Sequence, residues 1–80
     1  MRVLLFAGLA ERAGRRELEV ALPGAATTVD GLLTVLREAS PALDGAVFRV
    51  AVNRRYARGA DPVRAEDEVA LIPPVSGGRR

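Results

Sequence analysis

The sequence predicts a two-layer α+β domain, with one helix packed across one face of a mixed sheet of about five strands. The first observation is a continuous apolar stripe at helical spacing within residues 27–40. The second is that short apolar or alternating segments, typical of strands, lie on both sides of that stripe along the chain. A length of 80 residues with 49% hydrophobic content fits one small globular domain.

Two strands are predicted before the helix. Residues 2–7 (RVLLFA) are an apolar run, and residues 16–22 (RELEVAL) alternate in polarity, so the second is expected to be half buried and paired with the first as a hairpin. Its inward side chains are Leu18, Val20 and Leu22. Residues 8–14 form one helical turn or a loop closed by Gly14, and Pro23 with Gly24 ends the second strand.

The predicted helix covers residues 27–40. Thr27 or Thr28 can cap its free amide groups, and Asp30 in the first turn suits the helix dipole. The apolar stripe consists of Val29, Leu32, Leu33 and Leu36. Gly31 weakens the helix slightly, and Pro41 ends it.

Three further strands are predicted after the helix, at residues 47–53, 55–57 and 68–72, the middle one short and at a sheet edge. This order of elements fits a ubiquitin-like β-grasp fold, in which the first and last strands lie side by side at the centre of the sheet. We therefore expect a β-grasp domain over residues 1–72 and a flexible C-terminal tail over residues 73–80, carrying a glycine pair.

The first and last strands are apolar on both faces, although one helix can cover only one face. The side chains expected to face the helix are Val3, Leu5, Val69 and Leu71, with Leu18, Val20, Leu22, Val50 and Val52 from other strands. Those left facing away are Leu4, Phe6, Ala70 and Ile72. Either loops fold over this second face or it binds a partner protein, and Tyr56 on the edge strand extends it.

The composition argues against several classes of function. The chain has no cysteine and no histidine, so a metal site and a histidine base are not expected. All twelve basic residues are arginine, ten acids reduce the net charge to +2, and aromatic residues are few, so nucleic acid is not an expected partner. No segment has the length of a membrane span or the layout of a signal peptide, so we expect a cytoplasmic protein without a membrane partner.

The end of the sequence, "PPVSGGRR", is its most specific feature. Pro73 and Pro74 favour a stiff, extended path, whereas Gly77 and Gly78 lack side chains and can enter a narrow channel. From residue 73 to residue 78 the chain can reach roughly 20 Å at about 3.3 Å per residue. The alternative is an ordinary frayed terminus.

The chain resembles the small subunit of molybdopterin synthase, in the MoaD family of ubiquitin-like sulfur carriers. The resemblance covers residues 1–78. It is carried by "FAGLAERAG", "TTVDGLL", "VAVN" and, most specifically, "EDEVALIPPVSGG".

This resemblance implies a carrier without catalytic machinery or a bound cofactor. A partner like ubiquitin-activating enzyme adenylates the terminal glycine carboxylate with ATP, and a sulfur donor enzyme converts it to a thiocarboxylate. The tail then enters the large synthase subunit, within a heterotetramer, and gives its sulfur to cyclic pyranopterin monophosphate. The resemblance places the sulfur on Gly78. It assigns tail insertion to Pro73, Pro74, Val75, Ser76 and Gly77, and the partner surface to Phe6, Tyr56 and Ile72.

Three positions depart from the family pattern. Glu66 stands where a glycine is usual, so backbone strain is expected there, and Ala10 stands where an arginine is common, a role that Arg12 can replace. Residues 79–80, two arginines, follow Gly78, so no free glycine carboxylate is present, and we expect a processing peptidase to remove them. The alternatives to this removal are that this form is an inactive precursor, or that the C-terminal arginine is used directly, although its long charged side chain would fit a glycine channel badly. The alternatives are a sulfur carrier for thiamine thiazole, tRNA thiolation or amino acid synthesis, and a β-grasp interaction module without sulfur chemistry.

Overall fold

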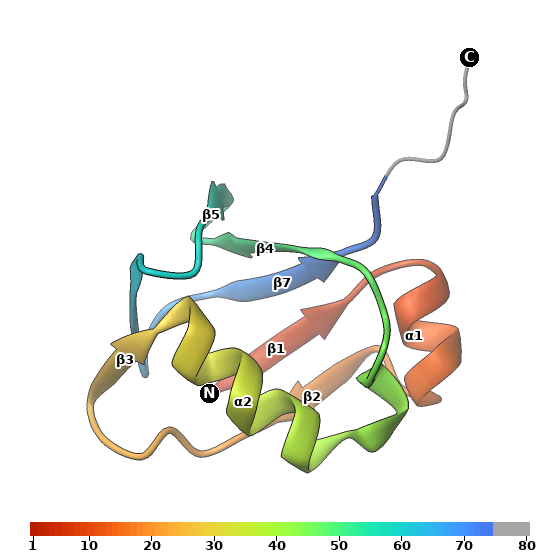
Figure 1. Cartoon of the computed structure of the whole chain (residues 1–80), viewed down its shortest axis with the longest axis horizontal. Helices are drawn as coiled ribbons and strands as arrows, with labels where there is room; N and C mark the ends of the chain where they lie inside the picture. Colours follow the sequence, from red (N-terminus) through yellow and green to blue (C-terminus); the bar gives the residue numbers. More distant parts are fainter. Residues whose placement is uncertain (75–80) are drawn as a thin grey trace.

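The computed structural model describes residues 1–74 and has the predicted α+β architecture (Figure 1). In chain order the elements are β1 (Arg2–Leu5), α1 (Gly8–Ala13), β2 (Glu17–Glu19), β3 (Ala26–Thr28), α2 (Val29–Ala39), the 3-10 turn η1 (Pro41–Leu43), β4 (Arg49–Val52), β5 (Arg55–Ala57), β6 (Pro62–Arg64) and β7 (Val69–Ile72). The main sheet has the strand order β2-β1-β7-β4-β5. This is the β-grasp arrangement, which confirms the predicted fold.

The first and last strands lie side by side at the centre of the sheet, as expected. β1 and β7 are parallel, with Val3 opposite Val69 and Leu5 opposite Leu71. β2 pairs antiparallel with β1, β4 pairs antiparallel with β7, and β5 forms the far edge. The strand β1 is shorter than predicted because the chain turns at Ala7, where φ is 51° and α1 begins.

The helix α2 begins and ends near its predicted limits. The Thr28 side chain is the N-cap, and its hydroxyl oxygen accepts a hydrogen bond of 3.2 Å from the Gly31 amide. A Cβ at Gly31 would collide with the Thr27 hydroxyl, so this glycine makes room for the entry into the helix rather than only weakening it. The helix ends at Ala39, and Pro41 starts η1.

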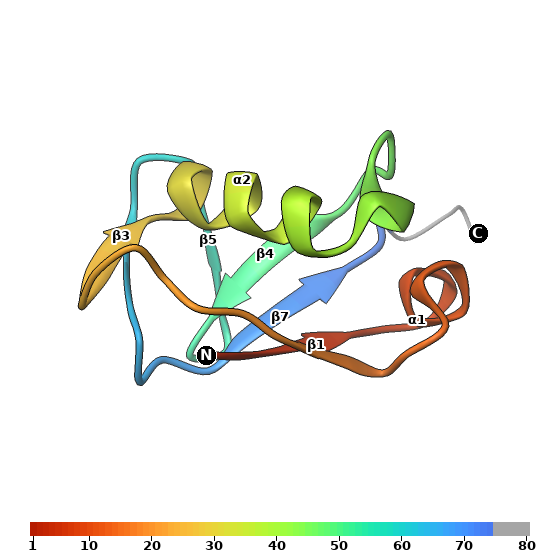
Figure 2. The same ribbon diagram turned by 90° about the horizontal axis from the view of Figure 1, so that it is seen from below.

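The helix α2 lies across one face of the sheet (Figure 2), and the buried hydrophobic cluster includes residues of both. The predicted inward residues of β1 and β7 are all at most 4% exposed, which confirms the predicted direction of these strands. On the helix Val29, Leu32 and Leu36 are buried, whereas Leu33 is only partly buried. Leu22 and Val52 are likewise partly buried and pack against this core.

A second, two-stranded sheet was not predicted. β3 pairs antiparallel with β6, which places Thr27 opposite Val63, and the Val63 side chain is 0% exposed. The Val29 amide also donates to the Asp61 carbonyl at 3.0 Å. Polar residues dominate the surrounding sequence, so the periodicity there does not distinguish this strand from a loop.

The segment that contains α1 is joined to η1 by an arginine. The Arg12 Nε donates to the Ala42 carbonyl at 2.7 Å, and its Nη2 donates to the Asp44 carbonyl at 3.1 Å. Arg12 therefore makes a polar contact in the segment where Ala10 replaces the arginine that is common in the family.

No helix within residues 1–74 has both the length and the apolar character to cross a bilayer.

Candidate functional site: an apolar groove on the open face of the sheet

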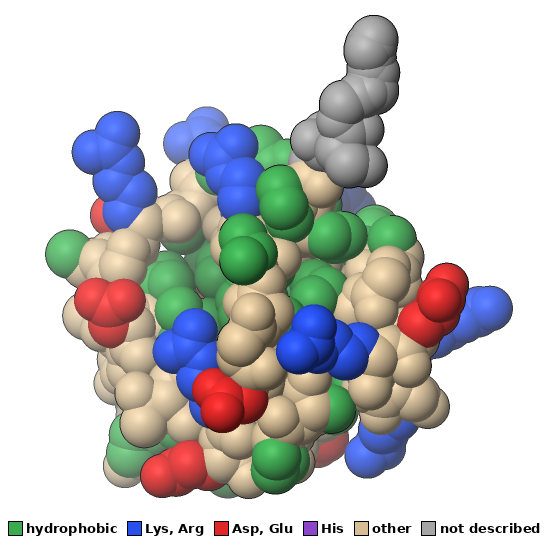
Figure 3. Space-filling model, turned by 45° about the vertical axis from the view of Figure 1, so that its right-hand side comes forward, with side chains coloured by type: hydrophobic (Ala, Val, Ile, Leu, Met, Phe, Trp, Pro, Cys, Tyr) green, Lys and Arg blue, Asp and Glu red, His purple; other side chains and the backbone are tan. Residues whose placement is uncertain are grey.

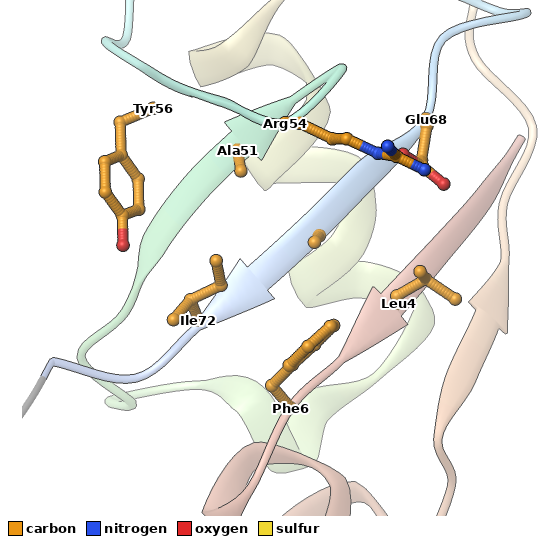
Figure 4. Close-up of a pocket in the computed structure, with 8 residues that line it drawn as sticks. Leu4, Phe6, Ala51, Arg54, Tyr56, Glu68 and Ile72 are labelled. Atoms are coloured by element: carbon orange, nitrogen blue, oxygen red, sulfur yellow. The ribbon is translucent and has the colours of Figure 1, made fainter.

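A groove of about 420 Å³ runs along the sheet face opposite α2. Its lining residues are Leu4, Phe6, Ala51, Arg54, Tyr56, Glu68, Ala70 and Ile72 (Figure 4). The prediction that Leu4, Phe6, Ala70 and Ile72 face away from the helix is therefore correct. Tyr56, predicted to extend this surface from the edge strand, lines the same groove.

The shape of the groove follows from the sizes of its side chains. Ala51 on β4 and Ala70 on β7 are register partners near the middle of the sheet, and their methyl groups leave a shallow floor. The larger side chains of Phe6 and Leu4 stand on one side of this floor, and Tyr56 stands on the other (Figure 4). A floor of alanines between aromatic walls can accept an apolar side chain from another protein.

The groove is open to solvent in the part of the chain that the structure describes. Phe6 is 49% exposed and Tyr56 is 56% exposed, so large aromatic surfaces face water. The alternative that loops of residues 1–74 fold over this face is therefore not what the structure shows. Exposed aromatic side chains around a hollow are typical of a surface that binds another protein.

An ion pair closes one end of the groove. Arg54 Nε lies 3.5 Å from Glu68 Oε1, and both residues line the groove (Figure 4). Arg54 is positioned by the two-residue turn between β4 and β5, where Asn53 and Arg54 both have positive φ values of 51° and 69°. Such turns favour residues like asparagine at the first position, whereas an arginine at the second is uncommon.

Asn53 ties this turn to the loop before β7. Its Nδ2 donates to Asp67 Oδ1 at 3.1 Å, and its Oδ1 accepts from the Glu68 amide at 3.0 Å. The Arg64 amide donates to Asp67 Oδ2 at 2.8 Å. The hydrogen bond from the Arg64 backbone, followed by that from Asn53, holds the pKa of Asp67 below its usual value. Asp67 thus organises the turn, a role that sequence reasoning did not assign to it.

The expected strain at Glu66 is absent. The non-glycine residues with positive φ in the described chain are Ala7, Asn53 and Arg54, so Glu66 occupies an ordinary backbone conformation. The Cβ at this position is tolerated because Asp67 and Asn53 fix the turn by side-chain hydrogen bonds instead of a left-handed backbone. The prediction of strain at residue 66 was wrong.

Arg49 lies beside the groove on the same strand face as Ala51. Its guanidinium carbon is 3.9 Å from the centroid of the Tyr56 ring, a cation–π distance. In the register Arg49 is opposite Ile72, the last residue of β7. Sequence reasoning missed Arg49, although its spacing of two from Ala51 places both residues on one face of a strand.

The remaining predicted site residues belong to the tail. Pro73 and Pro74 follow β7 directly, with Pro73 half-buried and Pro74 exposed. Val75, Ser76, Gly77 and Gly78, together with the two following arginines, lie outside the described residues. Ile72 in the groove wall and Pro73 are consecutive residues, so the chain leaves β7 at the groove.

The charged side chains do not form a broad patch of one sign on the side seen in Figure 3. Arginines and acidic residues are interspersed there, with apolar side chains between them. Residues 1–74 contain no cluster of three or more potential metal ligands. The features that the structure does supply are an apolar groove and an adjacent chain end, which together suit protein binding.

Comparison with protein families supplies the identification. The model of the ThiS family matches residues 3–78, which include every residue that lines the groove. The chain belongs to the ThiS family of ubiquitin-like sulfur carriers.

The relatives of this sulfur carrier include both a small archaeal modifier protein and molybdopterin synthase sulfur carrier subunits. Small archaeal modifier protein 1 of Haloferax volcanii is 43% identical, covering 92% of this chain and 95% of the relative. Its crystal structure superposes with a TM-score of 0.82 at 40% identity, covering 98% of each chain. The molybdopterin synthase sulfur carrier subunit of Chlamydomonas reinhardtii is 42% identical, covering 98% of each chain.

A solved protein complex shares the fold. It contains subunits 1 and 2 of the molybdopterin-converting factor of Helicobacter pylori, and its matching chain has a TM-score of 0.66 at 22% identity, covering 96% of each chain. At this identity the likeness concerns the fold alone.

Proposed function

We propose that this chain is the sulfur carrier subunit of molybdopterin synthase. The observation that carries the proposal is the continuity between groove and tail: Ile72 lines the groove, and the glycine-ending segment follows within six residues. A partner that covers the groove is therefore placed to receive the tail. The molybdopterin synthase sulfur carrier subunits among the relatives and the "PPVSGG" sequence support this proposal.

The proposed chemistry activates a glycine carboxylate in two steps. An adenylyltransferase joins the Gly78 carboxylate to the AMP part of ATP and releases pyrophosphate. A sulfur donor enzyme then delivers sulfur at the sulfide level, which forms a bond to the acyl carbon and displaces AMP, so that a thiocarboxylate remains. Because this sulfur is ionised and nucleophilic at neutral pH, the carrier needs no base of its own to attack the pyranopterin precursor in the large subunit.

Tail insertion explains the proposed division of the chain. Residues 1–72 would form the domain that binds the partner, and residues 73–80 would form the tail. Within this tail Pro73 and Pro74 direct the chain away from the sheet. Val75, Ser76 and Gly77 would lie inside the partner's channel, and Gly78 would carry the sulfur. The removal of residues 79–80 is part of the proposal, because a peptide bond after Gly78 leaves no glycine carboxylate to activate.

A second candidate function is protein modification. The similarity to small archaeal modifier protein 1 favours it, because this relative matches over nearly its whole length. The same activated Gly78 carboxyl would then be attacked by an amine of a target protein, giving an amide and releasing AMP. Adenylation of Gly78 is common to both functions. The product distinguishes them, because a sulfur carrier forms a thiocarboxylate and a modifier forms an amide with a target protein.

The first experiment is the intact mass of the native protein from its own cells, measured under conditions that preserve thioacids. A species ending at Gly78 with one carboxyl oxygen replaced by sulfur supports carriage and trimming together. Full-length protein alone, in cells that make the cofactor, contradicts the proposal. Amide conjugates to other proteins without any thiocarboxylate would favour the modifier function instead.

A matched in vitro comparison tests the role of Gly78. One protein ends at Gly78 and the other keeps residues 79–80, and each is incubated with the activating enzyme and ATP. Pyrophosphate release is expected only from the shorter protein. Equal release from both would contradict the requirement for trimming.

A further inference from the structure

We propose that Arg49 binds a carboxylate of the protein that covers the groove and thereby helps to select that protein. This inference rests on the proposed function, which supplies the large synthase subunit as the partner. The occupant is therefore a folded protein surface that presents an apolar side chain to the groove and an aspartate or glutamate beside Tyr56.

The charges on the open sheet face are the first part of the argument. Glu17 pairs with Arg2 at 3.2 Å, and Glu19 pairs with the amino group of Met1 at 3.0 Å. At the end of the groove, Glu68 pairs with Arg54. Arg49 forms no ion pair with any carboxylate in residues 1–74, so it leaves one uncompensated positive charge beside an apolar surface.

The orientation of Arg49 is the second part. Its guanidinium lies over the Tyr56 ring, which restricts a side chain that is otherwise free to rotate. A stacked guanidinium keeps the N–H groups at its edge free to donate two parallel hydrogen bonds, which match a carboxylate. Arginine and tyrosine are also the residue types that contribute most often to the energetic centre of protein interfaces.

The third part is what happens when a partner covers the groove. Water around Arg49 is then displaced, and an unpaired buried guanidinium is strongly unfavourable. A carboxylate on the partner removes this penalty and makes partners without one bind less well. On the same face of a second copy, Glu17, Glu19 and Glu68 already lie in ion pairs, so the occupant proposed here is a different protein that brings its own carboxylate.

The test measures the dissociation constant between this chain, ending at Gly78, and the purified large subunit from the same organism. The variants are R49Q, which removes the charge at similar length, R49K and R49L. R55Q is the matched control, because Arg55 lies on the neighbouring strand opposite Val52 and its side chain points away from the groove face. Titrations at about 0.05 M and about 0.5 M salt separate ionic from apolar binding.

We expect R49Q to weaken binding at low salt by at least about tenfold and to reduce the dependence on salt. R49K should recover part of the affinity, and R55Q should stay within about twofold of the unchanged chain. Equal or tighter binding by R49Q or R49L would overturn the inference. So would self-association of the free chain that R49Q abolishes, since a second copy would then be the occupant.

The variant Phe6→Ala distinguishes the two levels of proposal. If it weakens binding while R49Q does not, the groove receives the large subunit and only the role of Arg49 is wrong. If the unchanged chain does not bind the large subunit at all, the proposed function and the inference fail together.

Discussion

The substitution Val63→Ala tests whether the small β3–β6 sheet is part of the hydrophobic core. The Val63 side chain is 0% exposed and belongs to the same buried cluster as the helix and the central strands. Val47 provides the matched control, because its side chain is 73% exposed. The same two methyl groups are thus removed from a buried and from an exposed position.

The magnitude follows from the buried groups that are lost. Two methyl groups at about 0.8 kcal/mol each give about 1.6 kcal/mol of transfer free energy. The cavity that remains raises the loss in the free energy of unfolding to about 2–3 kcal/mol. A domain of this length has a total stability of about 4–12 kcal/mol, so the loss is a large fraction of it.

The assay is thermal and urea denaturation followed by circular dichroism. Val63→Ala should lower the melting temperature by about 8–24 °C, since 1 kcal/mol corresponds to about 4–8 °C in a domain of this size. Val47→Ala should change the free energy of unfolding by less than about 0.5 kcal/mol. Equal effects of the two substitutions would refute the assignment of Val63 to the core.

Three further predictions concern the backbone, the groove and a turn. Ala7→Gly should raise the free energy of unfolding by about 1 kcal/mol in urea titrations, because Ala7 has a positive φ that glycine adopts readily; a loss of stability would contradict this. Ala70→Leu should fill the groove floor, so binding of the large subunit should weaken by about tenfold or more in calorimetry while the melting temperature changes little; unchanged binding would exclude the groove. The lowered pKa of Asp67 stabilises the fold above the unfolded value of 3.8, and this contribution is lost as the pH falls through the folded pKa. Asp67→Asn should therefore be less stable than the unchanged chain at pH 7. In acid denaturation the difference should shrink below the unfolded value of 3.8 and disappear once the pH is below the folded pKa, and a difference that stays constant over this range would contradict the assignment.

The elements with strong periodicity could be predicted from the sequence. The stripe that includes Val29, Leu32 and Leu36 fixes both the existence of α2 and the side of it that is buried. The alternation around Leu18 does the same for β2. These signals are strong because burying one face of a helix or strand requires a regular spacing of apolar residues.

The remaining elements are held by contacts between residues far apart in the sequence, which the periodic spacing of apolar residues does not indicate. β3 and β6 pair across more than thirty residues of sequence, and Val63 is the one apolar side chain that β6 contributes to the core. Asn53 and Asp67 are polar residues in turns, and only the fold brings them within hydrogen-bonding distance. The strain assigned to residue 66 failed for the same reason, since another pair of side chains stabilises that turn.

The candidate site was partly predictable because the central strands have apolar residues on both faces, more than one helix can cover. One helix covers one face of the sheet, so apolar residues at alternate positions such as Leu4 and Ala70 must remain outside. Alternation along the strands shows which of their residues face the groove. It does not show that Ala51 lies opposite Ala70 and forms the floor, because that depends on the register of the two strands. Arg49 could not be distinguished from other arginines in the sequence.

The position of Arg49 near one end of the groove would fix the orientation of a bound partner, in addition to the fit that the groove's shape provides. Apolar surface alone would accept many partners, because the hydrophobic effect depends on area and not on orientation. One end of the groove is closed by the paired charges of Arg54 and Glu68, and Arg49 stands opposite Ile72, where β7 ends and the tail starts. A partner aligned by a carboxylate at that point would hold its binding channel next to Pro73, so the contact that selects the partner would also guide the tail into it.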